Sequence, residues 1–409
     1  MNNLRVKRDP IEYLLIFFII ILLPFENSFL QESFLGIYGA SLSVIPVVLL
    51  FIFKLINNKI QKEFFYFFLY SIFIFIFSAL VFYLLGYNES IVLFQPLKNL
   101  ILYTTWFYIF FYFKNYKCVE DLKTPIRILF YLIVFLSVIS VFFTDFLNGL
   151  KLLNYQEDRN QRPRGFSLEA STFGFLLICI FLLYSWIKKK NLLVYISILS
   201  LILIGIGTKG GLSLLLISFF ICSLVLFKKN ILKNIMYIIL FFIIYLLVFD
   251  LLKNQFISDL ENYTSIATRS TLFLLGWLSV VYSPVGMGFS GYYPYFYNNI
   301  DNIISIIRGT LQFNLNFYEL ESYSKIGNFE NIGTKSFILD CIITYGIPFI
   351  IISFLYIKDI IKFSVINDQY YRLFFLIFLL LALMFYNSSF GMYIGAFSMG
   401  LLFNKEFGK

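Results

Sequence analysis

The sequence contains no histidine. This absence removes the base of Ser-His and Cys-His nucleophile pairs, imidazole metal ligands and histidine general acid–base chemistry. Cysteine is scarce too, and the four residues form no C-x-x-C pair: Cys118, Cys179, Cys222 and Cys341. Because three of them lie in apolar runs, they are typical of small core residues and predict neither a disulfide framework nor a zinc site. We therefore expect an activity without a bound metal or cofactor.

Charge is the second scarcity, since Asp, Glu, Lys and Arg make up 13% of the 409 residues. Ordinary soluble domains carry about 25%. Apolar residues make up 60%, and a soluble chain could not bury this many Phe, Ile and Leu side chains. Apolar runs recur along the chain at the length of about 20 residues that crosses ~30 Å of hydrocarbon. The predicted fold class is an all-α integral membrane protein.

We expect about twelve transmembrane helices, forming a single polytopic domain over residues 1–409. The predicted spans are 11–25, 36–53, 64–86, 91–113, 128–149, 171–187, 192–207, 210–227, 235–252, 336–357, 373–387 and 390–403. The first span follows Arg5, Lys7 and Arg8, and no small-residue cleavage site comes after it. It is therefore predicted to be an anchor and not a removed signal peptide.

The basic residues predict the orientation of these spans. With both termini inside, the cytoplasmic loops and ends hold 21 of the 32 Lys and Arg residues. Short loops rich in Lys and Arg stay inside, so an N-in, C-in topology is predicted. Most other basic residues lie in two longer outer loops, 150–170 and 253–335. The net charge of +9 is thus explained by topology, and no basic face for nucleic acid is predicted.

Three arginines stand close together in the first outer loop, namely Arg159, Arg162 and Arg164. A guanidinium group offers a planar fork of N–H donors that matches phosphate oxygens. Gly165 would let the backbone approach a ligand, and the serines that follow could cap the next helix: Ser167 and Ser171. This loop is a candidate anion site. In the alternative interpretation it is a solvated loop whose arginines pair with its own acids: Glu157, Asp158 and Glu169.

The stretch 208–211 reads Thr-Lys-Gly-Gly and is predicted to turn on the outer side before a transmembrane helix. The N–H groups of a helix N-terminus attract an anion, and Lys209 beside Gly210 would strengthen that attraction. The alternative is a lysine that extends toward the interface beside turn-forming glycines.

The second outer loop contains two semi-apolar stretches, 270–282 and 303–317, the latter with Arg308. Both are predicted as interfacial or re-entrant helices, since each is too short or too polar to span. The Gly286-x-Gly288 sequence between them lacks the strand-and-helix context of a nucleotide site, so a flexible turn is predicted. Four tyrosines follow, which either stack on sugars or form an interfacial belt: Tyr292, Tyr293, Tyr295 and Tyr297.

Four acids lie near the ends of predicted spans: Glu12, Asp145, Asp250 and Asp340. An ion-coupled transporter would place ionisable groups within the membrane, so their positions disfavour that class.

In their order and shared outer side, these features resemble the Wzy-type polysaccharide polymerases of the O-antigen polymerase/ligase group. Four segments carry the resemblance. Residues 164–174 resemble the group's arginine–glycine–glutamate loop, and 208–211 its Ser-Arg-Gly-type turn with Lys in place of Arg. Residues 269–288 resemble its R…P-x-G-x-G stretch, and 335–348 its following helix containing T-Y-G-I. The likeness covers roughly residues 150–360.

Two departures from the group's pattern bear on the function. Some members carry a glycine eleven positions after an outer-loop arginine, and neither Arg164 nor Arg269 has one. Their substrate-capture roles therefore do not transfer by position. The ligase branch relies on an outer-loop histidine, which this chain lacks, and this favours polymerase over ligase.

The resemblance implies glycosyl transfer at the outer face of a bacterial inner (cytoplasmic) membrane. The growing glycan would leave undecaprenyl pyrophosphate and join a new lipid-linked repeat of an O-antigen, capsule or exopolysaccharide. Arg164 and Arg269 would stabilise the leaving group, and Glu169 is the candidate base. The candidate pyrophosphate-binding residues are Arg159, Arg162, Lys209, Gly210 and Arg308.

The expected partners are the lipid-linked glycan, membrane lipid, a chain-length regulator and a flippase, without nucleic acid. Two alternative activities stay open, an O-antigen ligase and a lipid-linked oligosaccharide transporter or flippase. A transporter often has two related halves, and here the long loops are unevenly placed. A structural scaffold would not need outer arginines.

Overall fold

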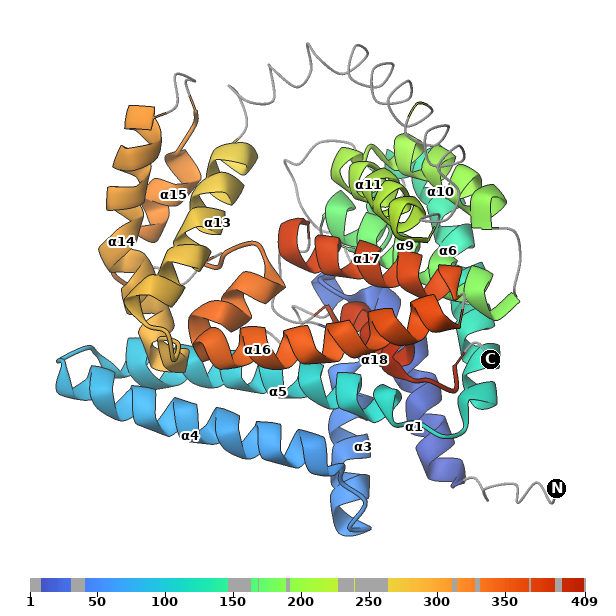
Figure 1. The fold of residues 1–409 in the computed structure, drawn as a ribbon, viewed down its shortest axis with the longest axis horizontal. Helices are drawn as coiled ribbons and strands as arrows, with labels where there is room; N and C mark the ends of the chain where they lie inside the picture. Colours follow the sequence, from blue (N-terminus) through green and yellow to red (C-terminus); the bar gives the residue numbers. More distant parts are fainter. Residues whose placement is uncertain are drawn as a thin grey trace.

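The computed structural model describes residues 9–30, 41–145, 163–167, 169–188, 192–226, 239, 264–310, 315–327, 332–367, 369–386 and 392–407. Across these ranges the chain is helical and contains no strand (Figure 1), which confirms the all-α prediction for them. The helices are α1 (Pro10–Ile21), α3 (Val44–Ile56), α4 (Lys62–Leu84), α5 (Gln95–Lys114), α6 (Lys123–Phe142), α9 (Ala170–Lys188), α10 (Leu192–Ile206), α11 (Lys209–Leu226), α13 (Thr264–Tyr282), α14 (Gly288–Thr310), α15 (Tyr318–Tyr323), α16 (Phe337–Ile366), α17 (Tyr370–Phe385) and α18 (Tyr393–Phe403). Short turns precede α5 and α6: a π-helical turn (Ser90–Phe94) and a 3-10 turn (Val119–Leu122).

Four helical segments within these ranges are long and apolar enough to cross a membrane: Lys62–Leu84, Val119–Phe142, Ala170–Lys188 and Phe337–Ile366. Shorter apolar helices accompany them, including α1, α3, α17 and α18. These features indicate a membrane protein. The predicted span 235–252 lies outside the described residues apart from residue 239, and the count of twelve spans stays a prediction.

The helices differ in how much of their surface the protein covers. α4 exposes large aromatic side chains such as Phe73, which is 64% exposed, and such a surface requires an apolar solvent. In contrast, α9 is buried on nearly all sides and contacts α6, α10, α11, α17 and α18. α9 is therefore the helix around which these five pack.

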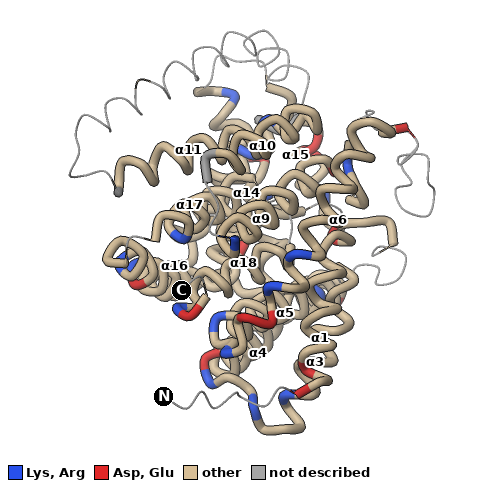
Figure 2. The backbone as a smooth tube through the Cα atoms, turned by 90° about the vertical axis from the view of Figure 1, so that its right-hand side faces the viewer, with Lys and Arg blue, Asp and Glu red and all other residues tan. Residues whose placement is uncertain are grey.

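Charged pairs show which helix ends lie together. Lys54 near the end of α3 pairs with Glu12 at the start of α1, with Nζ 2.6 Å from Oε1. Lys114 at the end of α5 pairs with Glu63 at the start of α4, with a Nζ–Oε2 distance of 2.7 Å. Figure 2 views the side of the molecule that carries both chain ends, and there blue and red segments lie at helix ends with long tan lengths between them. The two ion pairs thus lie at one end of these four helices, and the N-in, C-in topology stays a prediction.

The C-terminal segment is fixed at this same end by Arg372, the third residue of α17. Its side chain is fully buried, and its Nη2 donates to the carbonyl oxygen of Asn404 at 2.9 Å. The guanidinium lies between the rings of Trp186 and Phe363. These contacts depend on the planar shape of the guanidinium group as well as on its charge. It joins α17 to the chain beyond α18.

Within the described residues of the second predicted outer loop, the helices are longer than the sequence indicated. Where 270–282 and 303–317 were expected to form short interfacial helices, the chain forms the longer α13 and α14. Figure 1 shows α13, α14 and α15 side by side, standing across the ends of α4 and α5. A separate small hydrophobic core lies between these helices.

Both interpretations of the four tyrosines after Gly291 were wrong. They are buried in this second core, where the Tyr292 hydroxyl donates to Asp340 Oδ1 at 2.6 Å. The Tyr295 hydroxyl donates to the Leu275 carbonyl oxygen at 2.6 Å. The sequence did not predict this burial, because the hydrogen-bond partners of the tyrosines belong to α13 and α16, which are distant from them along the chain or form their own separate segments.

The turn before α14 was predicted to be flexible, and this was also wrong. Inside α16, Gly346 has φ 67° and ψ −152°, which interrupts the helix. The interruption separates the Ile343 carbonyl from the Ile347 N–H, which would bond to each other in a regular α-helix. The turn takes up both groups: Met287 N–H donates to Ile343 O and Ile347 N–H donates to Pro284 O, each at 2.7 Å. The turn is thus inserted into the kink of α16.

Topology can be tested with single cysteines in a background lacking the four native ones. A cysteine at Lys209, exposed at the start of α11, is expected to react with an impermeant thiol reagent in intact cells, or in spheroplasts where an outer membrane is present. A cysteine at Lys362, near the end of α16, is expected to react only after permeabilisation. The reverse pattern would invert the predicted orientation.

Candidate functional site

At the end of the bundle opposite those ion pairs, α9 begins beside the end of α1, and α16 begins beside the end of α17. The Asn27 side chain after α1 reaches Thr172 in the first turn of α9, at 3.5 Å. The Ser336 hydroxyl before α16 donates to the Leu383 carbonyl oxygen near the end of α17, at 3.1 Å. α11 and α18 also begin here, as the contacts below show. We call this the site end. Each helix N-terminus in it presents backbone N–H groups with partial positive charge.

The first outer loop is described from residue 163, so the candidates Arg159 and Arg162 lie outside the described residues. Arg164 is buried, and its carbonyl oxygen accepts a hydrogen bond from the Ser167 N–H at 3.0 Å. Gly165 has φ 58°, and a Cβ there would lie 2.5 Å from the Phe173 ring. Only glycine therefore allows the loop to fold against the start of α9. Ser167 was a candidate helix cap, but its hydroxyl donates to the backbone carbonyl of Glu26 instead.

Glu26 is a buried carboxyl group that the sequence analysis did not identify. Its Oε1 accepts a hydrogen bond from the Ile394 N–H at 2.7 Å, which caps the start of α18. Among the described residues, its Oε2 has no hydrogen-bond partner. Burial raises the pKa of Glu26 well above its ordinary value, and backbone groups of Ile394 and Tyr393 offset this only in part. Glu26 lies one residue beyond the predicted first span, where an acid is easily taken for a solvent-exposed loop residue.

The raised pKa of Glu26 predicts a pH-dependent stability. The protonated carboxyl group favours the fold at pH values below its ordinary pKa of 4.5, and this contribution is lost as pH rises through the folded-state pKa. The unfolding temperature of the wild-type protein is therefore expected to fall as pH rises above 4.5. Glu26→Gln imitates the protonated carboxyl group, so its unfolding temperature is expected to fall less over the same range. Thermal unfolding of both proteins in detergent across this pH range measures it. Parallel curves for the two proteins would contradict the assignment.

The predicted Lys-Gly-Gly turn forms the start of α11 and packs against Tyr386, the residue that follows α17. A Cβ on Gly210 would lie 2.9 Å from the Tyr386 ring, and one on Gly211 3.3 Å from its hydroxyl oxygen. The two glycines thus allow the tyrosine to approach the helix N-terminus directly. Lys209 is exposed beside them.

Arg269, in the second turn of α13, reaches the same place. Its Nη1 donates to the Phe385 carbonyl oxygen at 3.1 Å, one residue before Tyr386. The charges of both Arg269 and Glu169 act on the Tyr386 hydroxyl group. That hydroxyl is buried and has no hydrogen-bond partner within the described part of the chain. The structure therefore groups Glu169, Gly210, Arg269 and Tyr386, which we call the Tyr386 cluster.

Tyr386 was missed by sequence reasoning, because a tyrosine at the end of an apolar run gives no functional signal. Glu169, the candidate base, is partly exposed and accepts a hydrogen bond from the Ser171 hydroxyl at 3.1 Å. This contact holds the carboxylate at the start of α9. A carboxylate at the start of α9 could accept the proton of a sugar hydroxyl group bound nearby.

Arg308 is not placed with the Tyr386 cluster by any contact of the described residues. It lies near the end of α14, where its Nη2 is 2.9 Å from Glu321 Oε1 and its guanidinium stacks over Phe317. These contacts hold α14 against α15. Both members of the ion pair are more than half exposed, so the pair adds little stability.

Glu319 is another carboxylate near Arg269, since it accepts a hydrogen bond from Thr268 at 3.0 Å. Burial raises its pKa, but Lys335 and the hydroxyl groups of Tyr323 and Thr268 outweigh burial and lower the pKa overall. Glu319 is thus an ionised side chain with a structural role, and its hydrogen bond from Thr268 connects α15 to α13. In the described ranges, no three side chains of metal-ligating type lie together.

Comparison with known proteins adds one finding. A relative from Klebsiella pneumoniae, described as an uncharacterised 49.5 kDa protein in the cps region, is 29% identical over 408 residues. The match covers 97% of this chain and 91% of the relative. The relative belongs to a cps region. No family model and no solved structure matches the chain.

The geometry of the site end suits an anionic ligand. The Tyr386 cluster combines the N-terminus of α11 with Lys209 and Arg269, and a helix N-terminus supplies unpaired N–H donors. A guanidinium group has five N–H donors, and the hydrogen bond from Arg269 to the Phe385 carbonyl oxygen uses one of them. A phosphate group could be bound there by several donors at once.

Proposed function

We propose that this protein polymerises lipid-linked oligosaccharide repeat units. In this proposal the growing glycan is transferred from undecaprenyl pyrophosphate to a new lipid-linked repeat at the outer face of the inner membrane. The observation that carries it is the grouping of Arg269, Glu169 and Gly210 around Tyr386. The location of its relative in a capsule polysaccharide region supports a role in polysaccharide biosynthesis.

The proposed reaction breaks the bond between the anomeric carbon of the donor glycan and the pyrophosphate oxygen. A hydroxyl group of the acceptor sugar forms the new glycosidic bond and gives its proton to Glu169. Negative charge that develops on the departing pyrophosphate is stabilised by Arg269 and Arg164, with the α11 N-terminus and Lys209 as further donors. Undecaprenyl pyrophosphate leaves as the second product. We further propose that a flippase delivers the repeats and that a chain-length regulator limits the product.

Purified protein in lipid vesicles tests the proposal directly. Given only lipid-linked repeats, without metal or nucleotide, it is expected to produce a ladder of lipid-linked glycans. A vesicle preparation of Arg269→Ala protein at the same density serves as the control.

Deletion of the gene separates the alternatives, because each leaves a different intermediate. A missing polymerase leaves single repeats on the outer face, whereas a missing flippase leaves them on the cytoplasmic face. A missing ligase leaves long polymer attached to undecaprenyl pyrophosphate. Finding that long polymer in the deletion strain would refute the polymerase and favour the ligase, despite the absent histidine.

A further inference from the structure

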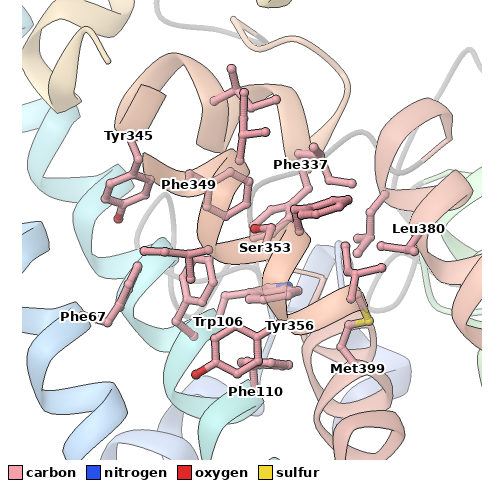
Figure 3. A pocket seen from close by; sticks show the side chains of 18 of the residues that line it. Phe67, Trp106, Phe110, Phe337, Tyr345, Phe349, Ser353, Tyr356, Leu380 and Met399 are labelled. Carbon is pink, nitrogen blue, oxygen red and sulfur yellow. The ribbon is translucent and has the colours of Figure 1, made fainter. Parts of the chain in front are cut away.

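A cavity of about 320 Å³ lies between α5, α16, α17 and α18 (Figure 3). Its lining is almost wholly apolar, and aromatic side chains of α5 and α16 face each other across it, among them Trp106, Phe110 and Phe349. Its volume falls within the range of roughly 300–1,000 Å³ that is usual for small-molecule sites. The kink at Gly346 lies along this wall, so the cavity depends on the irregular backbone of α16.

The cavity opens sideways, toward the surface that would face lipid. Ile352 and Phe354 both line it, and they are 53% and 63% exposed. Neighbouring side chains on the same face of α16, such as Leu355, are also exposed and apolar. A chain of a membrane lipid could therefore enter the cavity from the bilayer without crossing water.

Part of the cavity wall is connected to the Tyr386 cluster through α13 and α17. Arg269, Phe273 and Trp277 are spaced four residues apart on α13 and so lie on one face of that helix. Trp277 lines the cavity, and the Phe273 ring stacks on Phe385 with centroids 5.5 Å apart. Arg269 donates to the carbonyl group of the same Phe385, and Met384 beside it lines the cavity. A cationic group thus lies about two helical turns along α13 from a residue of the apolar cavity wall.

We propose that this cavity binds the part of an isoprenoid chain next to the headgroup of a polyprenyl phosphate lipid, with the phosphate at Arg269. The proposal rests on the proposed function and deepens it by assigning the site of the carrier lipid. Lipid tails are as apolar as the cavity, so transfer from the bilayer gains little from the hydrophobic effect. Selectivity must come from close packing of a methyl-branched chain against the aromatic walls, together with the arginine–phosphate contact.

The native tryptophans provide the measurement. Of the three in the chain, Trp106 and Trp277 line the cavity, whereas Trp186 packs against Phe407 elsewhere. The probe is a polyprenyl monophosphate brominated in the isoprene units nearest the phosphate, since bromine quenches tryptophan fluorescence on contact. In vesicles, the wild-type protein is expected to show saturable quenching at low probe density. Brominated phosphatidylglycerol at the same density is expected to quench weakly and without saturation.

Two variants locate the binding. Ser353→Phe places a ring in the cavity and is expected to weaken probe binding about tenfold. Leu355→Phe, a matched change on the exposed side of the same helix, is expected to bind the probe normally. Trp277→Phe removes one of the two cavity reporters and is expected to reduce the quenching amplitude, leaving the part that comes from Trp106.

Equal quenching by the two lipids would mean that bulk phospholipid fills the cavity, and this would overturn the proposal. Unchanged binding by Ser353→Phe would place the probe elsewhere and overturn it as well. A failure of the cavity proposal can be distinguished from a failure of the proposed polymerase function. Glycan polymerisation without saturable quenching removes the cavity proposal alone, whereas saturable quenching without polymerisation removes the polymerase proposal alone.

Discussion

Replacing Arg269 by alanine is expected to lower the rate of glycan transfer about 10²–10³-fold, the usual effect of removing one charge-stabilising donor. The Nη1 atom of this side chain donates to the Phe385 carbonyl oxygen, next to Tyr386, whose ring packs against the α11 N-terminus. Its loss would remove the donor nearest the proposed pyrophosphate while leaving the α13 backbone in place. Arg164→Ala is expected to lose activity to a similar extent. The ladder assay in vesicles, run as a single turnover, measures both rates.

Conservative and distant replacements serve as controls for these variants. Arg269→Lys is expected to recover part of the rate, because an ammonium group keeps the charge but not the planar fork. Arg127→Ala, on an exposed position of α6, is expected to leave the rate unchanged. Wild-type rates for both Arg164→Ala and Arg269→Ala at normal protein levels would show that neither arginine takes part in the transfer and would remove the proposed chemistry.

Replacing Gly346 by alanine is expected to destabilise the fold by more than about 4 kcal/mol. A Cβ at this position would lie 2.3 Å from the backbone nitrogen of Gly286 and from the Pro284 carbonyl oxygen. Backbone atoms on the two sides cannot move apart without breaking the hydrogen bonds that hold the turn in the kink. The positive φ of 67° adds strain that only glycine avoids.

Gly309→Ala is the matched control for that substitution, because nothing lies within 4 Å of a Cβ at that site. It is expected to be neutral or slightly stabilising, since Gly309 is helical and alanine favours a helix. The yield of monodisperse protein in detergent and its unfolding temperature measure both variants. A normal unfolding temperature for Gly346→Ala would show that the turn does not occupy the kink.

The fold was predictable where a helix is uniformly apolar. α4, α9 and α16 follow from runs of apolar residues whose length matches a bilayer. The segment 253–335 was not predictable in the same way. The spacing of the tyrosines in α14 does not distinguish a buried core helix from a helix at the membrane interface. Their burial is decided by α13 and by Asp340 on α16, which are distant in sequence.

The site was predictable to the extent that glycine and arginine mark it. Gly210 and Arg269 were identified from residue type and position, and the structure brings both to Tyr386. Tyr386 and Glu26 could not be identified, since each lies at the end of an apolar run and gains its significance only from burial beside other helices. Arg308 was selected for its charge, and its contacts are those of an ion pair between α14 and α15.

The contacts between α14 and the α4–α5 pair have a consequence for synthesis of the chain. Ser290 N–H donates to the Ser78 hydroxyl oxygen, and the Ser290 hydroxyl donates to the Val92 carbonyl oxygen. These partners are 212 and 198 positions apart. At about 5–20 residues per second, the ribosome needs roughly 10–40 s to reach Ser290 after Ser78. During that interval α4 and α5 must persist in the membrane without α14, so a chaperone or the insertion machinery has time to act on this pair before the site end is assembled.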